Sequence, residues 1–258
     1  ISACLVGSEM CIRDRSLATD QLAFASSNPD PSLANALDRG LNIKLLASLV
    51  TNKPGDAPAA FLVRQDLIDS GKYKSPKDLK GMKVGVPAQQ SGFYVNLFMQ
   101  KDGLTAQDVN LVPLGGVADI PPAFANKGID AAWDTEPFNT IMQQQHVAKV
   151  VAVTGDLLPG AVGAVLGIGP GFAKNQPEAS QRFVNAFLRG MRDYYHAFIK
   201  KDTPKGPIVQ TFINHTPVKN PKLYDTMGLQ SVDPNGNFDL SSWNTLQAYW
   251  VKVGLQPK

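Results

Sequence analysis

Apolar and polar positions follow the same plan in two separate stretches of the chain. Residues 20–49 and residues 130–153 each read as a short strand, a polar loop containing proline, a helix and a second strand. In both copies an acidic residue opens the first strand and an aromatic residue stands at its end. Open α/β sheets bind ligands at the carboxyl ends of their strands. The repeat therefore predicts two similar lobes, and a cleft between such lobes is suited to enclosing a small molecule.

The rest of the chain continues the alternation of strands and helices. Short apolar runs predict further strands at 59–63, 83–86, 109–114 and 162–169. Apolar spacing, caps and glycine stops predict helices at 66–71, 93–101, 120–127, 177–201 and 243–253. This order of elements predicts an α/β fold with mainly parallel sheets flanked by helices.

Residues 1–15 differ from the rest, because they show neither a helical nor a strand period. The run from Cys4 to Arg15 resembles translated sequencing-adapter read-through, so we interpret residues 1–15 as a non-native segment. Both cysteines, Cys4 and Cys11, lie in it. The remaining body then has no cysteine, which excludes disulfides, cysteine zinc sites and thiol catalysis there. The segment also lacks the basic start and apolar run of an export signal.

Composition and motifs narrow the class of function further. The formal net charge is +3, and no run of basic residues is present. This argues against nucleic acid as the main partner. No apolar stretch reaches the roughly 18 residues of a membrane span. The three histidines, His146, His196 and His215, lack metal-ligand spacing, and no nucleophile elbow or phosphate loop occurs. We therefore expect no enzyme activity, no cofactor and no metal.

Polar loops that follow predicted strands hold the first candidate binding residues. Ser26 and Ser27 follow the first strand, and Gln90, Ser91 and Gly92 lie between a strand and a helix start. Exposed amide hydrogens and the helix dipole favour an anion or another acceptor at such a start. Helix capping by Ser91 and turn chemistry at the serine pair are the alternatives.

The run from Trp133 to Phe138 is the most specific local motif. Trp133 could stack on a planar ligand, and Asp134 and Glu136 could accept from a ligand N–H group or cation. A buried hydrophobe is the alternative for Trp133, and a first-turn residue favoured by the helix dipole is the alternative for Glu136. A buried carboxylate opposes an anionic ligand, so the motif leaves two solute classes open, an oxyanion and a planar nitrogen-bearing compound.

Four motifs in order resemble those of ABC-importer solute-binding proteins. The family includes binders of nitrate, bicarbonate, taurine and other sulfonates, and the thiamine pyrimidine precursor. The first two motifs resemble the first-lobe signature and the crossing into the second lobe, and the last two resemble the second-lobe ligand loop and the return to the first lobe. They lie at residues 20–48, 76–86, 128–138 and 176–187.

The resemblance implies a two-lobed periplasmic-binding-protein type II fold with a hinge formed by two crossing segments. Lobe one is expected at residues 16–80 and 165–258, and lobe two at 81–164. Family members begin with a strand, a helix and a strand before the position of Leu17. We therefore expect this chain to be a fragment that lacks those elements and its export signal.

By homologous position, eight residues would contact the ligand. Lobe one would supply Phe24, Ser26 and Ser27, and lobe two would supply Gln90, Ser91, Gly92, Trp133 and Glu136. The resemblance implies a small-molecule ligand enclosed by lobe closure, an ABC permease as partner, a monomer, and a periplasmic or membrane-tethered extracytoplasmic location. The alternatives are the ligand-sensing domain of a regulator and an enzyme resembling a fungal pyrimidine synthase, whose route needs a cysteine cluster.

Overall fold

The computed structural model describes residues 9–87, 89–228, 230–237 and 240–256, with the backbone alone for 9–12 and 89–91. The chain forms two compact units. Unit 1 consists of residues 1–52, 160–208 and 231–258, and unit 2 consists of residues 53–159 and 209–230. The chain thus passes between the units four times, where the sequence predicted two crossings.

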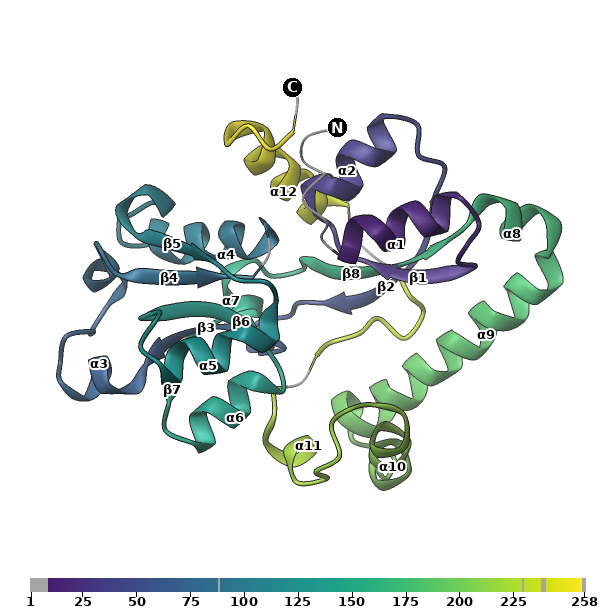
Figure 1. Cartoon of the computed structure of the whole chain (residues 1–258). Helices are drawn as coiled ribbons and strands as arrows, with labels where there is room; N and C mark the ends of the chain where they lie inside the picture. The colour runs from purple at the N-terminus through teal and green to yellow at the C-terminus, as the bar shows by residue number, and fades with distance from the viewer. Residues whose placement is uncertain (1–8, 88, 229, 238–239, 257–258) are drawn as a thin grey trace. The chain divides into compact units, whose positions relative to one another are not determined.

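Unit 2 is built on a five-stranded sheet with the order β5-β4-β6-β3-β7 (Figure 1). Its strands are β3 (Ala59–Arg64), β4 (Lys83–Val86), β5 (Asn110–Pro113), β6 (Ala131–Thr135) and β7 (Ala148–Val153). β4 runs parallel to β5 and β6, whereas β3 runs antiparallel to both of its neighbours. Strand β3 is apolar along almost its whole length and buried, as expected for a strand covered on both faces.

Helices cover both faces of this sheet (Figure 1). On one face α4 (Gln89–Gln100) buries Val95, Phe98 and Met99 against Phe61 and Val84 of the sheet. On the other face the core joins Leu62 and Ala132 to α5 (Ile120–Ala125) and α6 (Phe138–Gln144). The shorter helices are α3 (Gln65–Asp69), α7 (Thr154–Leu157) and α11 (Leu223–Thr226), with 3-10 turns at Pro76–Leu79, Ala106–Asp108 and Val117–Asp119.

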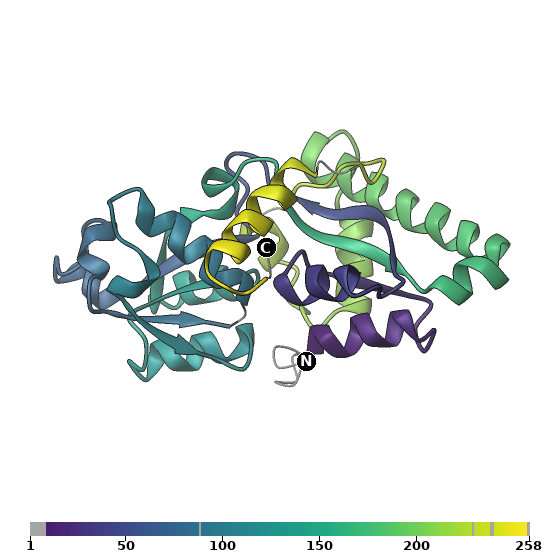
Figure 2. The same cartoon turned by 90° about the horizontal axis from the view of Figure 1, so that it is seen from above.

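Unit 1 is built on a three-stranded sheet with the order β1-β8-β2. Its strands are β1 (Phe24–Ser27), β2 (Lys44–Thr51) and β8 (Val162–Ile168), and β8 runs antiparallel to both neighbours. Two helices, α1 (Glu9–Ala18) and α2 (Pro31–Asp38), lie side by side (Figure 2). Leu17, Leu33 and Ile43 form the buried core between these helices and the sheet.

The remaining helices of unit 1 follow β8. They are α8 (Pro170–Asn175), α9 (Pro177–Tyr194) and α12 (Ser241–Lys252). The predicted single helix at 177–201 is α-helical to Tyr194 and continues as a π-helical turn, Tyr195–Lys200, which ends where Lys201 adopts a left-handed φ of 57°. The helix α10 (Gly206–His215) begins in unit 1 and continues in unit 2.

The internal repeat predicted from the sequence is present in both units. β1, α2 and β2 form the first copy, and β6, α6 and β7 form the second. In each copy the two strands flank one reversed strand, β8 in unit 1 and β3 in unit 2. Each reversed strand comes from the part of the chain that follows a passage from the other unit. The unit 2 sheet is therefore mixed and the described unit 1 sheet is antiparallel, so four of the six described neighbour pairs are antiparallel.

Three expectations differ from the structure in detail. Residues 9–18 form α1, although no helical period was expected there. Residues 53–80, expected in lobe one, belong to unit 2 because β3 pairs with β6 and β7. The first strand begins at Phe24 rather than Asp20, whose carboxylate instead accepts hydrogen bonds from the amides of Gly171 and Phe172 at the start of α8. Within the described residues, no helix combines the length and the apolar character needed to cross a membrane.

Candidate functional site

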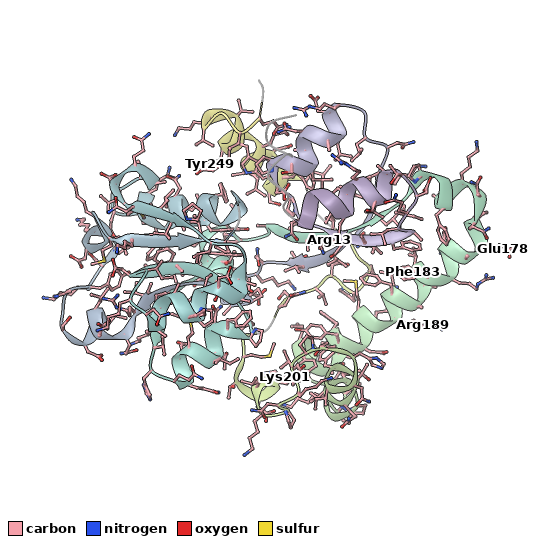
Figure 3. The ribbon with its side chains drawn as sticks, viewed as in Figure 1. Arg13, Glu178, Phe183, Arg189, Lys201 and Tyr249 are labelled. Atoms are coloured by element: carbon pink, nitrogen blue, oxygen red, sulfur yellow. The ribbon has the colours of Figure 1, made fainter. Side chains whose placement is uncertain are left out.

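In unit 1 three of the predicted ligand residues lie on β1. Phe24 is half-buried and stacks on Phe183 of α9, with 3.9 Å between ring centroids, while Phe172 meets it edge-on at 5.5 Å. Figure 3 shows Phe183 on α9, which runs past β1. Phe183 itself is 41% exposed. The cluster therefore presents a partly open aromatic surface at the start of β1.

The two serines of β1 are bonded to α1. Arg13, labelled in Figure 3, donates from Nη1 to the exposed Ser26 hydroxyl at 3.2 Å. Ser27 is only 2% exposed and donates from Oγ to Oδ1 of Asp14 at 2.7 Å. Burial raises the pKa of the Asp14 carboxyl, and the Ser27 hydrogen bond opposes this. Ser27 is thus engaged inside unit 1, whereas Ser26 remains accessible.

Asp30 ends the loop that follows these serines. Its carboxylate accepts from the Leu33 amide at 2.9 Å and so caps α2, and the side chain is 4% exposed. Burial raises the pKa of the Asp30 carboxyl to about 6, although the helix amides stabilise its charge. At neutral pH this carboxylate is therefore mostly ionised.

In unit 2 the predicted residues lie at one edge of the sheet. β4 and β6 are parallel neighbours, so the start of α4 after β4 and the loop after β6 meet at the same carboxyl edge. The side chains of Gln90 and Ser91 lie outside the described residues. Gly92 is in the first turn of α4, and a methyl group placed on its Cα would meet no described atom outside the adjoining helix backbone within 4 Å. This part of the edge can therefore admit a solute atom close to the backbone.

Trp133 faces α4 and is partly buried. Its ring lies parallel to that of Tyr94, with an interplanar angle of 8° and 5.7 Å between centroids. Its Nε1–H donates to the Thr154 hydroxyl at 3.3 Å, and that hydroxyl donates to the Ala59 carbonyl at 2.8 Å. These contacts hold the ring in one orientation, so it could offer a fixed aromatic edge to a ligand.

The Glu136 carboxylate accepts hydrogen bonds from other residues of unit 2. Oε1 accepts from the Gly228 amide at 2.8 Å and from the Thr140 hydroxyl at 3.0 Å, and Oε2 accepts from the Thr140 amide at 3.2 Å. The hydrogen bonds from Thr140 therefore support the alternative in which Glu136 stabilises the start of α6. Burial raises the pKa of its carboxyl, while these three donors stabilise the charged form.

Asp134 and Asn139 lie on the opposite face of β6 from Trp133, since side chains alternate along a strand. They are 0% and 1% exposed. Burial raises the pKa of the Asp134 carboxyl to about 8, the Thr135 amide opposes this, and the charge of Glu136 adds to it. Asp134 is therefore largely uncharged at neutral pH.

Sequence reasoning located the strands but missed the partners that fix their ends. The missed residues are Tyr94, Asn139, Thr154 and Gly228, which contact Trp133, Asp134 or Glu136. The sequence contained one sign of the Glu136 contacts: Thr140 lies four residues later, within reach of a side chain at the helix start. In the described part of the chain, no group of three or more histidine, cysteine, aspartate or glutamate side chains could hold a metal ion.

Solved structures share the fold over nearly the whole chain. The alkanesulfonate-binding protein SsuA from Xanthomonas axonopodis pv. citri, bound to MOPS, has a TM-score of 0.72 at 15% identity, covering 96% of this chain and 81% of that one. The periplasmic aliphatic sulphonate binding protein SsuA from Escherichia coli has a TM-score of 0.69 at 17% identity, covering 95% and 75%. A mutant of DSZB in complex with biphenyl-2-sulfinic acid, a protein elsewhere titled a desulfurization enzyme, has a TM-score of 0.65 at 16% identity, covering 95% and 83%. These likenesses establish the periplasmic-binding-protein fold.

Sequence comparison identifies the family. An inferred binding protein of Brucella abortus (strain 2308) is 37% identical over 91 residues, which cover 34% of this chain and only 28% of that relative's length. The family model described as NMT1/THI5 like matches residues 5–197. Its match begins inside the segment that the sequence analysis interpreted as non-native. Because it covers most of the chain, the chain belongs to the NMT1/THI5-like family.

Proposed function

We propose that this chain is the solute-binding component of an ABC importer and that it takes a small organic anion of the sulfonate class. The observation that carries the function is the family match over residues 5–197. The two sulfonate-binding relatives of the same fold support the choice of solute class. Enclosure of the solute by the two units, delivery to a membrane permease, a monomeric state and an extracytoplasmic location all belong to this proposal.

The hydrogen bonding of Glu136 supports an anion over a nitrogen-bearing ring. A free carboxylate was the reason to consider a ligand that donates N–H groups. Three donors from Thr140 and Gly228 already occupy the Glu136 carboxylate. The neighbouring Asp134 is buried and largely neutral, because its pKa lies at about 8. Asp134 then carries little charge at neutral pH, and the donors from Thr140 and Gly228 leave the Glu136 carboxylate without a free acceptor for a ligand N–H group.

A thermal-shift screen of this chain tests the function and the solute class together. The panel holds methanesulfonate, propanesulfonate, nitrate, a pyrimidine and propylamine, each at several concentrations. Binding to the folded state raises the melting temperature by mass action, and the sulfonates are expected to give the shift. A shift with the pyrimidine or the amine alone would contradict the solute class, and no shift with any compound would contradict the solute-binding function for this chain.

The variant Glu136→Gln separates a ligand contact from a structural contact. Gln keeps an acceptor oxygen for Gly228 but cannot accept on its nitrogen from the Thr140 amide. We expect the free energy of unfolding to fall by about 1 kcal/mol, while sulfonate affinity changes less than threefold. A change of sulfonate affinity of about tenfold or more with normal stability would instead place the Glu136 carboxylate at the solute. Chemical denaturation and calorimetric titration give the two readouts.

The enzyme alternative predicts a chemical change in the solute that a binding protein does not cause. A binding protein returns the sulfonate unchanged after release, whereas an enzyme of the DSZB type would consume it. Mass spectrometry of the solute after prolonged incubation with the chain measures this directly. We expect complete recovery, and release of sulfite or sulfate in proportion to time would overturn the binding-protein proposal.

A further inference from the structure

Two buried acceptor atoms beside the loop after β6 have no hydrogen-bond donor. Asp134 Oδ1 accepts from the Thr135 amide at 2.7 Å, but Oδ2 has no partner among the described residues. Asn139 donates from Nδ2 to the main-chain oxygen of Asp134 at 3.3 Å, and its Oδ1 likewise has no partner there. Both side chains are almost completely inaccessible to solvent. Polar atoms in such positions normally have partners, so this pair requires an explanation.

The hydrogen bond between the two residues fixes the orientation of the Asn139 side-chain amide. If the Asn139 amide were turned over, its oxygen would face the main-chain oxygen of Asp134, and two acceptors would repel each other. When Asn139 Nδ2 donates to the Asp134 main-chain oxygen, Asn139 Oδ1 is left needing a hydrogen-bond donor. An ionised Asp134 cannot supply one, because a carboxylate only accepts. A single proton on Oδ2 turns the pair of acceptors into a donor and an acceptor.

We propose that Asp134 is a positioning residue that acts as a neutral acid, donating from Oδ2–H to Oδ1 of Asn139 directly or through one buried water. The hydrogen bond joins the end of β6 to the first turn of α6. The segment between them carries Glu136 and follows Trp133 directly. Asp134 thus holds in place the turn between the candidate residues Trp133 and Glu136, and only a consequence for solute binding would rest on the proposed function.

Among the described residues, no cationic side chain is found to lower the pKa of Asp134. Ala60 lies opposite it on β3, and neither α5 nor α6 contains an ionisable residue. The charged group that acts on it is Glu136, which is itself an acid and disfavours a second negative charge. Tyr94 of α4 packs on Trp133, on the other face of the strand. Burial and the Glu136 charge both raise the pKa of Asp134, to about 8, in agreement with the geometry.

The sign of the pH dependence follows from linkage. The folded protein holds the Asp134 proton up to about pH 8, whereas the unfolded chain releases it near the ordinary aspartate pKa of 3.8. The stabilisation is therefore complete at low pH and is lost as the pH rises toward the folded pKa. Asn at this position mimics the neutral acid and donates from Nδ2 at every pH. We expect Asp134→Asn to melt above the parent by a margin that widens by roughly 10 °C between pH 5 and pH 9.

The experiment combines a direct titration with matched variants. Carbon-13 NMR follows the Asp134 carboxyl signal of the folded parent, assigned by its absence in Asp134→Asn, from pH 4 to pH 9.5. The proposal expects a midpoint near 8, and a midpoint below 5 would overturn it. Melting curves compare Asp134→Asn, Asp134→Ala and the exposed control Asp38→Asn. Asp134→Ala is expected to melt lower than the parent at pH 5 because Asn139 loses its donor, and Asp38→Asn is expected to follow the parent.

Two further outcomes keep the test independent of solute binding. If sodium, potassium or calcium raises the melting temperature of the parent but not of Asp134→Asn, a bound cation satisfies the two oxygens and the neutral acid is wrong. If Asp134→Asn fails to fold, the titration of the parent still decides. None of these readouts uses a solute, so a failure of the sulfonate proposal leaves them unchanged, and a low Asp134 midpoint leaves the solute screen unchanged.

Discussion

The two copies of the strand–helix–strand repeat share a topology but treat their buried acids differently. In unit 1, Asp30 caps α2, and the Leu33 amide supports its charge at 2.9 Å. In unit 2, Asp134 receives one amide from its own neighbour, Thr135, and lies beside Glu136. Burial is nearly complete at both acids. Two helix amides, those of Leu33 and Ser32, lower the pKa of Asp30, whereas only the Thr135 amide lowers that of Asp134 and the Glu136 charge raises it. The pKa is accordingly about 6 for Asp30 and about 8 for Asp134.

In the second copy, a hydrogen bond from a distant segment, residues 209–230, also stabilises the turn before α6. Gly228, from residues 209–230, donates to Glu136 at the start of α6. Its Cα lies so close to Ala57 that a Cβ there would clash with the Ala57 carbonyl group. Gln144 at the end of α6 donates to Thr226 of the same segment at 3.4 Å. One strand-to-helix turn is thus stabilised locally and the other by tertiary contacts.

The largest expected effect comes from breaking this tertiary contact. Gly228→Ala would force Ala57 and the segment apart, and we expect unit 2 to lose about 3 kcal/mol of stability. Chemical denaturation measures the loss, and limited proteolysis reports release of residues 209–230. The matched control is Gly190→Ala in α9, where the added methyl group meets nothing within 4 Å. The control should gain up to about 1 kcal/mol from helix propensity. Equal stability of Gly228→Ala and the parent would contradict the contact.

The next effect compares the two acids across a pH window. The folded pKa values of Asp30 and Asp134 are raised, so the stability that each proton adds is lost as the pH rises through the folded pKa. Of these two acids, only Asp134 still releases its proton on unfolding between pH 6 and 8. The free energy of unfolding therefore falls by about 1.4 kcal/mol per pH unit there because of Asp134. Asp30→Asn should leave the slope of stability against pH unchanged in this window, whereas Asp134→Asn should flatten it. Urea unfolding at pH 5 to 9 gives the slopes. A flattened slope in Asp30→Asn would reverse the order of the two acids.

The smallest effect on stability is expected at the edge of unit 2. Gly92→Ala adds a methyl group that meets no described atom outside the adjoining helix backbone within 4 Å, so stability should change by less than about 1 kcal/mol. If a solute approaches the backbone of α4 there, its affinity should fall at least tenfold. Calorimetric titration of the variant with propanesulfonate measures this. An unchanged affinity would remove Gly92 from the proposed site.

Local patterns in the sequence were enough to find the elements of both copies. The strand predicted at 148–153 has the bounds of β7, and the strand at 83–86 has those of β4. Short apolar runs between turn residues determine such strands without reference to the rest of the chain. The assignment of residues 53–80 failed because β3 is placed by pairing with β6 and β7, which lie about 70 and about 90 residues further along the chain. Local periodicity contains no information about such pairing.

The candidate site shows the same limit. The end of β4 was predicted, whereas β1 and β6 each run two residues past the predicted ends, so Ser26, Ser27, Asp134 and Thr135 lie in strands rather than in loops. The bonding of Glu136 to Gly228 joins residues 92 positions apart, and no motif signals it. The neutral character of Asp134 likewise depends on complete burial, which follows from packing between β6 and α6. Residue type predicts what an acid can do, but tertiary structure decides whether it is charged.

Calorimetric titration of this chain at pH 7 with propanesulfonate and, in parallel, with propylamine tests the central claim most directly. The two solutes have the same carbon chain and opposite charges. The account predicts saturable binding of the sulfonate with one solute per chain and no heat of binding for the amine. Saturable binding of the amine, with none for the sulfonate, would contradict the account, because it would require a carboxylate free to meet a cation.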